Sequence, residues 1–208
     1  MTDIIELIFD ENDPNWGVEC ISLVDSPAIE EDFIALNKHK VVLKAVDDEK
    51  HLAIGLALIP KKLIYRNANK EEGFEGEKYI WFASDTIRKV AQSFLIHKQN
   101  NNPTKLQHET TVSDVDLVES WIVEDTKKDK TAFYNLKAPV GSWAVAYSVK
   151  NTKVWKAIKD GIFNGFSIEG NFMPKVDITK EDKAMDDFLN SLGDGQKLAL
   201  AHQLINKR

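Results

Sequence analysis

The apolar residues of this chain fall mainly in short segments that end at Pro, Asp or Gly. Segments of this length, rich in β-branched residues and bounded by turn residues, are typical of strands. Because strands and helices do not alternate regularly along the chain, a doubly wound parallel sheet is disfavoured. We therefore expect an α+β fold, a mostly antiparallel β-barrel or sheet ringed by helices. The predicted strands are residues 4–9, 18–24, 41–46, 52–59, 77–82, 115–123, 143–149 and 165–173.

Two helices have clear start and stop signals. Ser84 can cap a helix whose apolar residues recur at helical spacing up to the Asn-rich residues 99–103. Asn151 can cap a second helix that stops at Gly161, because glycine is common just after the last helical residue. A third, shorter helix is predicted over residues 28–36.

The length of 208 residues suits one domain with a full core and a short appendage. Residues 1–175 are expected to form that domain. Residues 176–208 are expected to form a charged helical tail, interrupted near Gly193.

The chain is acidic, with 27 Lys and Arg against 33 Asp and Glu and a net charge of −6. A protein that binds nucleic acid through its phosphates needs the opposite sign, so we expect no nucleic-acid partner. The first residues lack the pattern of a signal peptide, and no apolar run is long enough to span a membrane. We expect a cytosolic protein with no membrane partner.

Cys20 is the only cysteine, which excludes an intrachain disulfide and a Cys-rich metal site and favours a reducing compartment. No two of the five histidines have the spacing of a helical zinc motif. We expect no metal site and no cofactor.

The residues that could support catalysis are few. Serine nucleophiles need a base to accept the hydroxyl proton and a third group to orient that base. Ser167 lies between two glycines, and His108 lies between an Asn-rich turn and a predicted strand. Glu169 would share a strand face with Ser167, and Glu119 follows His108, so either carboxylate could orient the imidazole. The alternative is that Ser167 is a tight packing position and His108 an ordinary surface or core residue.

Several short motifs follow one another over residues 81–172. The motifs are Ala91-Gln92-Ser93-Phe94-Leu95, Gln107-His108, Leu117-Val118-Glu119-Ser120-Trp121, Val140-Gly141-Ser142-Trp143 with residues 154–161 behind it, and Asn164-Gly165-Phe166-Ser167-Ile168-Glu169-Gly170. In this order and spacing they resemble the XkdF-like family of phage serine proteases, which belongs with the prohead maturation proteases of tailed phages. Residues 21–28 also resemble a segment that often precedes this domain.

The resemblance implies a fold similar to that of the herpesvirus assembly proteases, a compact antiparallel β-barrel ringed by helices, over residues 1–175. It implies a serine endopeptidase that matures the phage prohead through an acyl-enzyme. Its substrates would be the scaffold protein, the propeptide of the major capsid protein and the enzyme itself. Such an enzyme would act inside the immature capsid, in the cytoplasm of the bacterial host, and could form a homodimer.

The resemblance also implies roles for individual residues. Ser167 would be the nucleophile and His108 the general base. Herpesvirus relatives use a second histidine after the serine, but here only His202 follows, in the predicted tail. We therefore favour a carboxylate as the third member. The candidates, in order of preference, are Glu169, Glu119 and Asp177.

Other assignments stay open at this point. Backbone amides near Gly141 or Gly170 are candidate donors for an oxyanion hole. The same fold could also lack catalysis and serve as a capsid-assembly or scaffold-binding protein. A generic β-barrel binding module is a third reading.

Overall fold

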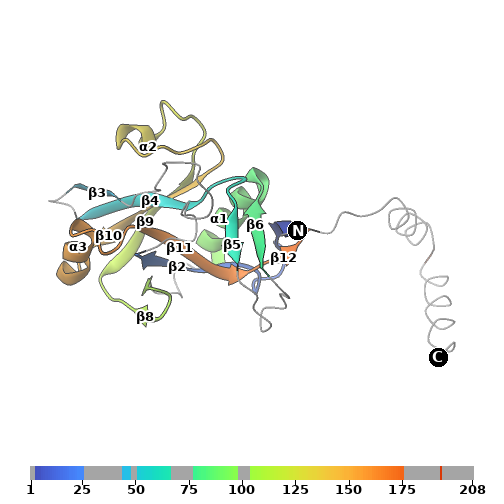
Figure 1. Ribbon diagram of the computed structural model, residues 1–208, viewed down its shortest axis with the longest axis horizontal. Coiled ribbons are helices and arrows are strands. Elements are labelled where there is room, and N and C mark those ends of the chain that lie inside the picture. The colour runs from blue at the N-terminus through green and yellow to red at the C-terminus, as the bar shows by residue number, and fades with distance from the viewer. Residues whose placement is uncertain are drawn as a thin grey trace. The chain divides into compact units, whose positions relative to one another are not determined.

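The computed structural model of the protein describes residues 3–25, 51–66, 77–97, 104–175 and 193, together with the backbone of residues 44–47 (Figure 1). The chain divides into two compact units, Met1–Pro174 and Lys175–Arg208. All helices and strands given below belong to the first unit. The helix expected over residues 28–36 lies outside the described residues, as do Asp177 and His202.

The strands form three four-stranded sheets. The first has the order β12 (Met173–Pro174), β1 (Asp3–Ile8), β6 (Lys78–Phe82) and β5 (Ile64–Arg66). The second has the order β3 (Lys44–Asp47), β4 (Leu52–Leu58), β10 (Trp143–Val149) and β9 (Val115–Ile122). The third has the order β11 (Gly165–Asn171), β2 (Gly17–Val24), β7 (Lys105–Leu106) and β8 (Thr110–Thr111).

Most of the strand pairing is antiparallel, as the sequence predicts. The pairs β1–β6 and β2–β7 are parallel, and the other described pairs are antiparallel. None of the three sheets closes on itself within the described residues. Closure needs a continuous ladder of staggered strands, and β5, β7, β8 and β12 have only two or three residues each. The α+β class is therefore confirmed, and the expected barrel is wrong: the strands form three open sheets.

The two central strands of the second sheet are buried on both faces. This explains why β4 and β10 are nearly continuous apolar runs instead of alternating ones. Successive side chains of the two strands point into two separate apolar clusters. The larger cluster includes Ala53, Ala57, Trp143, Val145 and Tyr147, and the smaller one includes Ile54, Leu56, Ala144 and Ala146.

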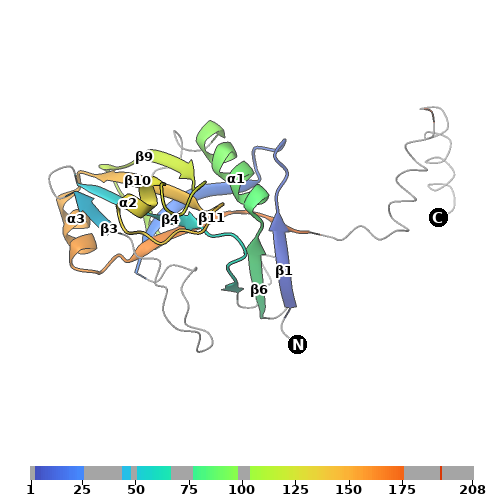
Figure 2. The same cartoon turned by 90° about the horizontal axis from the view of Figure 1, so that it is seen from above.

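The first helix, α1 (Ser84–His97), packs against β2, β9 and β10, as Figure 2 shows from above. Its apolar residues are buried at the spacing that predicted it, among them Ile87, Val90 and Phe94. The Phe94 ring meets Trp143 edge to face, with centroids 5.6 Å apart. The helix therefore fastens the third sheet to the second.

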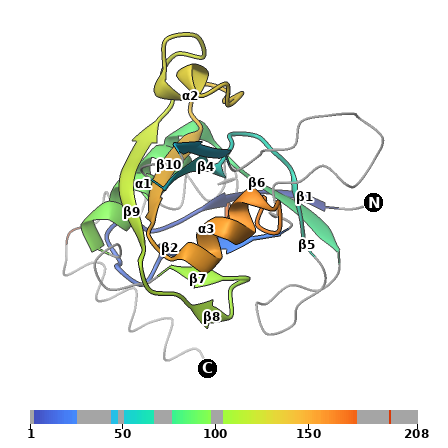
Figure 3. The ribbon, with the colours of Figure 1, turned by 90° about the vertical axis from the view of Figure 1, so that its left-hand side faces the viewer.

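The two other helices are short. Figure 3 shows α3 (Thr152–Lys159) beside the strands. Its predicted cap is confirmed, because the Asn151 side chain accepts hydrogen bonds from the amides of Lys153 and Val154. Gly161 follows with φ of 72°, as a residue just past a helix end often does. The one-turn helix α2 (Lys130–Phe133) follows β9. No helix among the described residues is long and apolar enough to cross a membrane.

Candidate active site

One face of the third sheet carries most of the predicted catalytic residues. Ser167 and Glu169 are two residues apart on β11 and so point to the same face of the sheet. The β11–β2 register places Ser167 opposite Ser22, and Glu169 opposite Cys20. On the other side of β2, the parallel strand β7 places Lys105 opposite Ser22. Three strands therefore contribute to one polar face.

The opposite face of this sheet is apolar. Ile21, Leu23 and Phe166 are almost completely buried in the main core. The Phe166 ring packs against Tyr147 of β10, with centroids 5.0 Å apart. Because a shift of one residue would exchange the two faces of a strand, this packing sets the register that groups the polar residues.

His108 lies in the turn between β7 and β8. The Glu109 amide donates to the Leu106 carbonyl across this turn, at 3.1 Å. Gln107 and His108 both have positive φ, 52° and 61°, as the two central residues of a type I′ turn do. Asn and Gly favour such positions, and other residues are strained there by roughly 1 kcal/mol each. The strain of this turn falls on the candidate base, a pattern common at functional sites.

Strand β2 holds the turn in place. The Gln107 amide donates to the Leu23 carbonyl at 2.9 Å, and the Gln107 side-chain oxygen accepts from the Asp25 amide at 3.2 Å. The turn is thus tied to the strand that also pairs with β11. This brings the imidazole of His108 to the face that carries Ser167 and Glu169.

Glu169 is the centre of the polar contacts on this face. Its Oε1 lies 2.5 Å from Nδ1 of His108, and its Oε2 lies 2.8 Å from Nζ of Lys105. The hydroxyl of Ser22 donates to Oε1 at a longer 3.4 Å. The side chain of Glu169 is 29% exposed, so these contacts are only partly screened by solvent.

The groups around Glu169 favour the ionised form of its carboxylate. Burial by itself would raise the pKa of Glu169, but the hydrogen bonds from Lys105 and His108 outweigh it and lower that pKa below its usual value. The hydrogen bond to Glu169 in turn raises the pKa of Lys105. Burial raises the pKa of the Cys20 thiol, which keeps it protonated and a poor nucleophile.

The contact with Glu169 uses Nδ1 of His108 and so leaves Nε2 for a hydroxyl proton. No hydrogen bond joins Ser167 to His108 among the described residues, and Ser167 is only 6% exposed. Catalytic hydrogen bonds are often long before substrate binds and tighten in its presence. The carboxylate of Glu169 and the imidazole of His108 are thus in contact, and Ser167 lies on the same sheet face.

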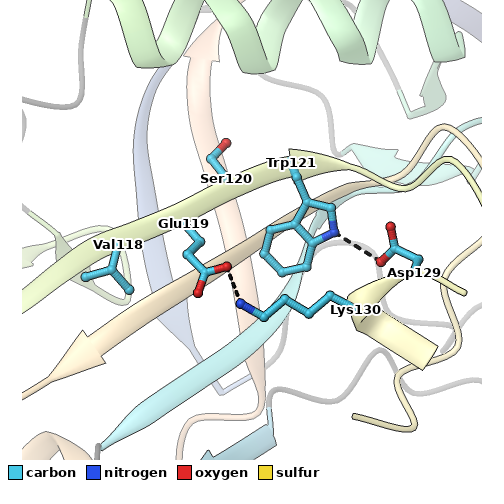
Figure 4. A pocket seen from close by; sticks show the side chains of 6 residues that line it. All are labelled: Val118, Glu119, Ser120, Trp121, Asp129 and Lys130. Carbon is cyan, nitrogen blue, oxygen red and sulfur yellow. Dashed lines mark hydrogen bonds and ion pairs between the residues drawn. The ribbon is translucent and has the colours of Figure 1, made fainter. Parts of the chain in front are cut away.

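Glu119, the other predicted carboxylate, lies elsewhere. It is on β9 and forms an ion pair with Lys130 of α2 (Figure 4). The two side chains line a pocket of about 450 Å³ with four other residues, Val118, Ser120, Trp121 and Asp129. No described contact connects Glu119 to His108. The structure thus brings Glu169, not Glu119, to the imidazole.

The two glycines considered for the oxyanion hole have structural roles. The Gly141 amide already donates to the Val123 carbonyl at 2.8 Å, so it is not free for an oxyanion here. Gly170 follows a bulge in β11, and a Cβ atom there would lie 2.2 Å from the carbonyl oxygen of Gly17. Only glycine allows β11 and β2 to approach this closely, directly beside Glu169.

Lys105 and Ser22 were not predicted as parts of the site. Both lie close to Glu169 only through the pairing of β2 with strands distant in the sequence. Ser22 does fall within residues 21–28, which resemble a segment that often precedes this domain. That resemblance is the one feature of the sequence that pointed to Ser22. The described residues contain no group of three or more His, Cys, Asp or Glu side chains placed to hold a metal ion.

Comparison with known proteins places the chain in a family of phage hydrolases. The family model described as "Putative phage serine protease XkdF" matches residues 38–175, about two thirds of the chain. The protein belongs to this family, which at that level identifies a phage serine protease. No curated protein and no solved structure shows a significant match.

The matched region includes His108, Ser167 and Glu169 but begins after β2. The structure nevertheless places β2 between β11 and β7, as the inner strand of the candidate site. The sheet that carries this polar face therefore includes a strand that lies before the matched region.

Proposed function

We propose that this protein is a serine endopeptidase in which Ser167 is the nucleophile, His108 the general base and Glu169 the residue that orients His108. The observation that carries this proposal is the 2.5 Å contact between Glu169 Oε1 and His108 Nδ1, on the sheet face to which Ser167 points. An imidazole held at Nδ1 by a carboxylate presents Nε2 to a hydroxyl, as the chemistry of a serine nucleophile requires.

The proposed reaction has two steps, acylation and deacylation. His108 Nε2 takes the proton of Ser167 as Oγ attacks the scissile carbonyl, and the imidazolium then protonates the leaving amine. Water, deprotonated by the same nitrogen, hydrolyses the acyl-enzyme and restores the serine. Throughout, Glu169 stabilises the positive charge that forms on the ring.

The biological setting extends this proposal beyond the family level. We infer that the enzyme acts on scaffold protein, on the propeptide of the major capsid protein and on its own chain. This would take place inside the immature capsid, in the bacterial cytoplasm, with a fold related to the herpesvirus assembly proteases. Two copies of the chain would form a homodimer. The family membership supports this setting, and the acidic net charge of −6 suits an enzyme that does not bind DNA.

The test uses the full-length protein and a fluorophosphonate probe, which transfers its phosphonyl group to an activated serine with loss of fluoride. We expect one labelled serine, Ser167, in the labelled peptide identified by mass spectrometry. Ser167→Ala should abolish labelling and keep the thermal melting temperature. Ser148→Ala is the matched control, because Ser148 is a half-buried strand serine of β10, outside this sheet face, and it should retain the label on Ser167.

Two results would contradict the proposal. Labelling that persists in Ser167→Ala would assign the nucleophile to another residue. Wild-type protein that is folded and not labelled over the full pH range would favour the alternative, a capsid-assembly or scaffold-binding protein without catalysis.

A further inference from the structure

Both oxygens of the Glu169 carboxylate have a nitrogen partner of their own. Oε1 meets His108, and Oε2 meets Lys105 at 2.8 Å. A carboxylate with one partner can rotate about its terminal torsion, whereas one that is held at both oxygens has a single favourable orientation. Lys105 therefore holds the carboxylate in the orientation that turns one of its oxygens toward the imidazole.

Few groups near Glu169 could hold its carboxylate in one orientation. On β2, Ser22 donates a hydrogen bond and Cys20 lies opposite with a protonated thiol. On β7 and the turn that follows it, Lys105 and His108 make the charged contacts. Glu19 adds negative charge near Lys105. Within the described part of the chain, the cations in contact with Glu169 are thus Lys105 and, once protonated, His108.

The reaction makes a specific demand on this carboxylate. When His108 takes the serine proton, its ring becomes positive, and Glu169 can stabilise the imidazolium only as an anion that faces Nδ1. Lys105 also repels the imidazolium, but it sits on the far oxygen, so the attraction of the nearer carboxylate outweighs it.

We propose that Lys105 is a positioning residue for this reaction, which holds the Glu169 carboxylate with Oε1 turned toward His108. The inference rests on the proposed catalytic role of Ser167 and His108 and adds a residue whose described hydrogen bond is to Glu169 and to neither of these two. Lys105 acts through Glu169, and its side chain is 33% exposed, so it can be replaced without opening a core cavity.

The test compares three variants by the rate of fluorophosphonate labelling as a function of pH. Lys105→Met removes the cation, Lys105→Arg keeps it, and Lys130→Met removes the similarly exposed partner of Glu119. We expect Lys105→Met to label at least about tenfold more slowly at neutral pH, because general-base catalysis depends on an oriented base. The acid limb of its profile should move to higher pH, because Glu169 loses the cation that keeps it ionised.

The two other variants make the result specific. Lys105→Arg should restore the wild-type acid limb, and Lys130→Met should leave both rate and profile unchanged. A Lys105→Met protein with a lower melting temperature and an unshifted profile would show that the lysine is only structural and would overturn the proposal.

A second measurement separates this inference from the proposed function. The carboxyl carbon of Glu169, followed by NMR during a pH titration, reports its ionisation without any catalytic step. If wild-type protein is not labelled, the proposed function fails. In that case, a titration midpoint that rises in Lys105→Met still supports the role of Lys105 on Glu169, and an unchanged midpoint rejects it.

Discussion

Glu169 and Glu119 make similar ion pairs but lie in different parts of the fold. Each is a partly exposed glutamate on a strand, 29% and 40% exposed, and each forms an ion pair with a lysine. Only Glu169 also contacts a histidine, and only Glu169 shares its sheet face with the candidate nucleophile. An ion pair by itself thus says little about function, and the approach of an imidazole from the β7–β8 turn is what marks the candidate site.

The contacts around Glu119 explain it as a structural residue. Lys130 lies over the Trp121 ring, 5.6 Å from its centroid, and the indole nitrogen donates to Asp129. Asp129 also caps α2 by accepting from the Thr131 amide, and these hydrogen bonds lower the pKa of Asp129 although burial opposes them. The pair of Glu119 with Lys130 therefore fastens α2 to β9.

The largest difference between the two glutamates should appear in labelling. Glu169→Gln keeps the size of the side chain but removes the charge that stabilises the imidazolium. We expect the fluorophosphonate labelling rate to fall by about 10² or more, while Glu119→Gln stays within about twofold of wild type. Equal losses in both variants would show that Glu169 has no special role. A larger loss in Glu119→Gln would show that Glu119 is the residue that orients His108.

Replacing Gly170, the glycine beside Glu169, should destabilise the folded protein. In Gly170→Ala the new methyl group meets the Gly17 carbonyl oxygen and the Val18 Cα, so β11 must move away from β2. We expect a loss of about 3 kcal/mol in the free energy of unfolding, at the upper end for overpacking. The measurement is urea denaturation.

The control for this substitution is Gly161→Ala, at the end of α3. Its φ is positive, but its neighbour atom is 3.8 Å away, so the expected loss is only about 1 kcal/mol. Labelling by the probe should fall in Gly170→Ala alone, because only that change shifts the strand that carries Glu169. A Gly170→Ala protein as stable as wild type would mean that the two strands do not approach as closely as described.

The smallest effect concerns acid stability. The pKa of Glu169 is lowered in the folded protein, so its ionised form contributes stability above the ordinary glutamate value of 4.5. That contribution is lost as the pH falls from this value through the lower pKa of the folded state. The difference in unfolding free energy between wild type and Glu169→Gln should therefore be positive at pH near 6, by about 1 kcal/mol or less, and vanish in acid. Urea titrations at several pH values would measure it, and a difference that grows in acid would contradict the sign of the shift.

Part of this site could be predicted from local pattern. The alternation of a strand places Ser167 and Glu169 on one face, and capping residues predicted α1 and α3 within a residue or two. No local pattern in the sequence predicts the contact of His108 with Glu169. That contact requires β7 to pair in parallel with β2, and β2 to pair with β11. Two-residue strands such as β7 have too little sequence to be predicted, and the type I′ turn that carries His108 lacks the usual Asn and Gly.

The sequence by itself determined the longer strands, the ends of α1 and α3 to within a residue or two and the motifs that mark a phage serine protease, since these depend on neighbouring residues. Only the tertiary structure decided which carboxylate meets the base, that Lys105 and Ser22 join it, and that the strands form three open sheets. Those features depend on pairing between distant segments, where the register is set by the packing of Ile21, Leu23 and Phe166 in the core.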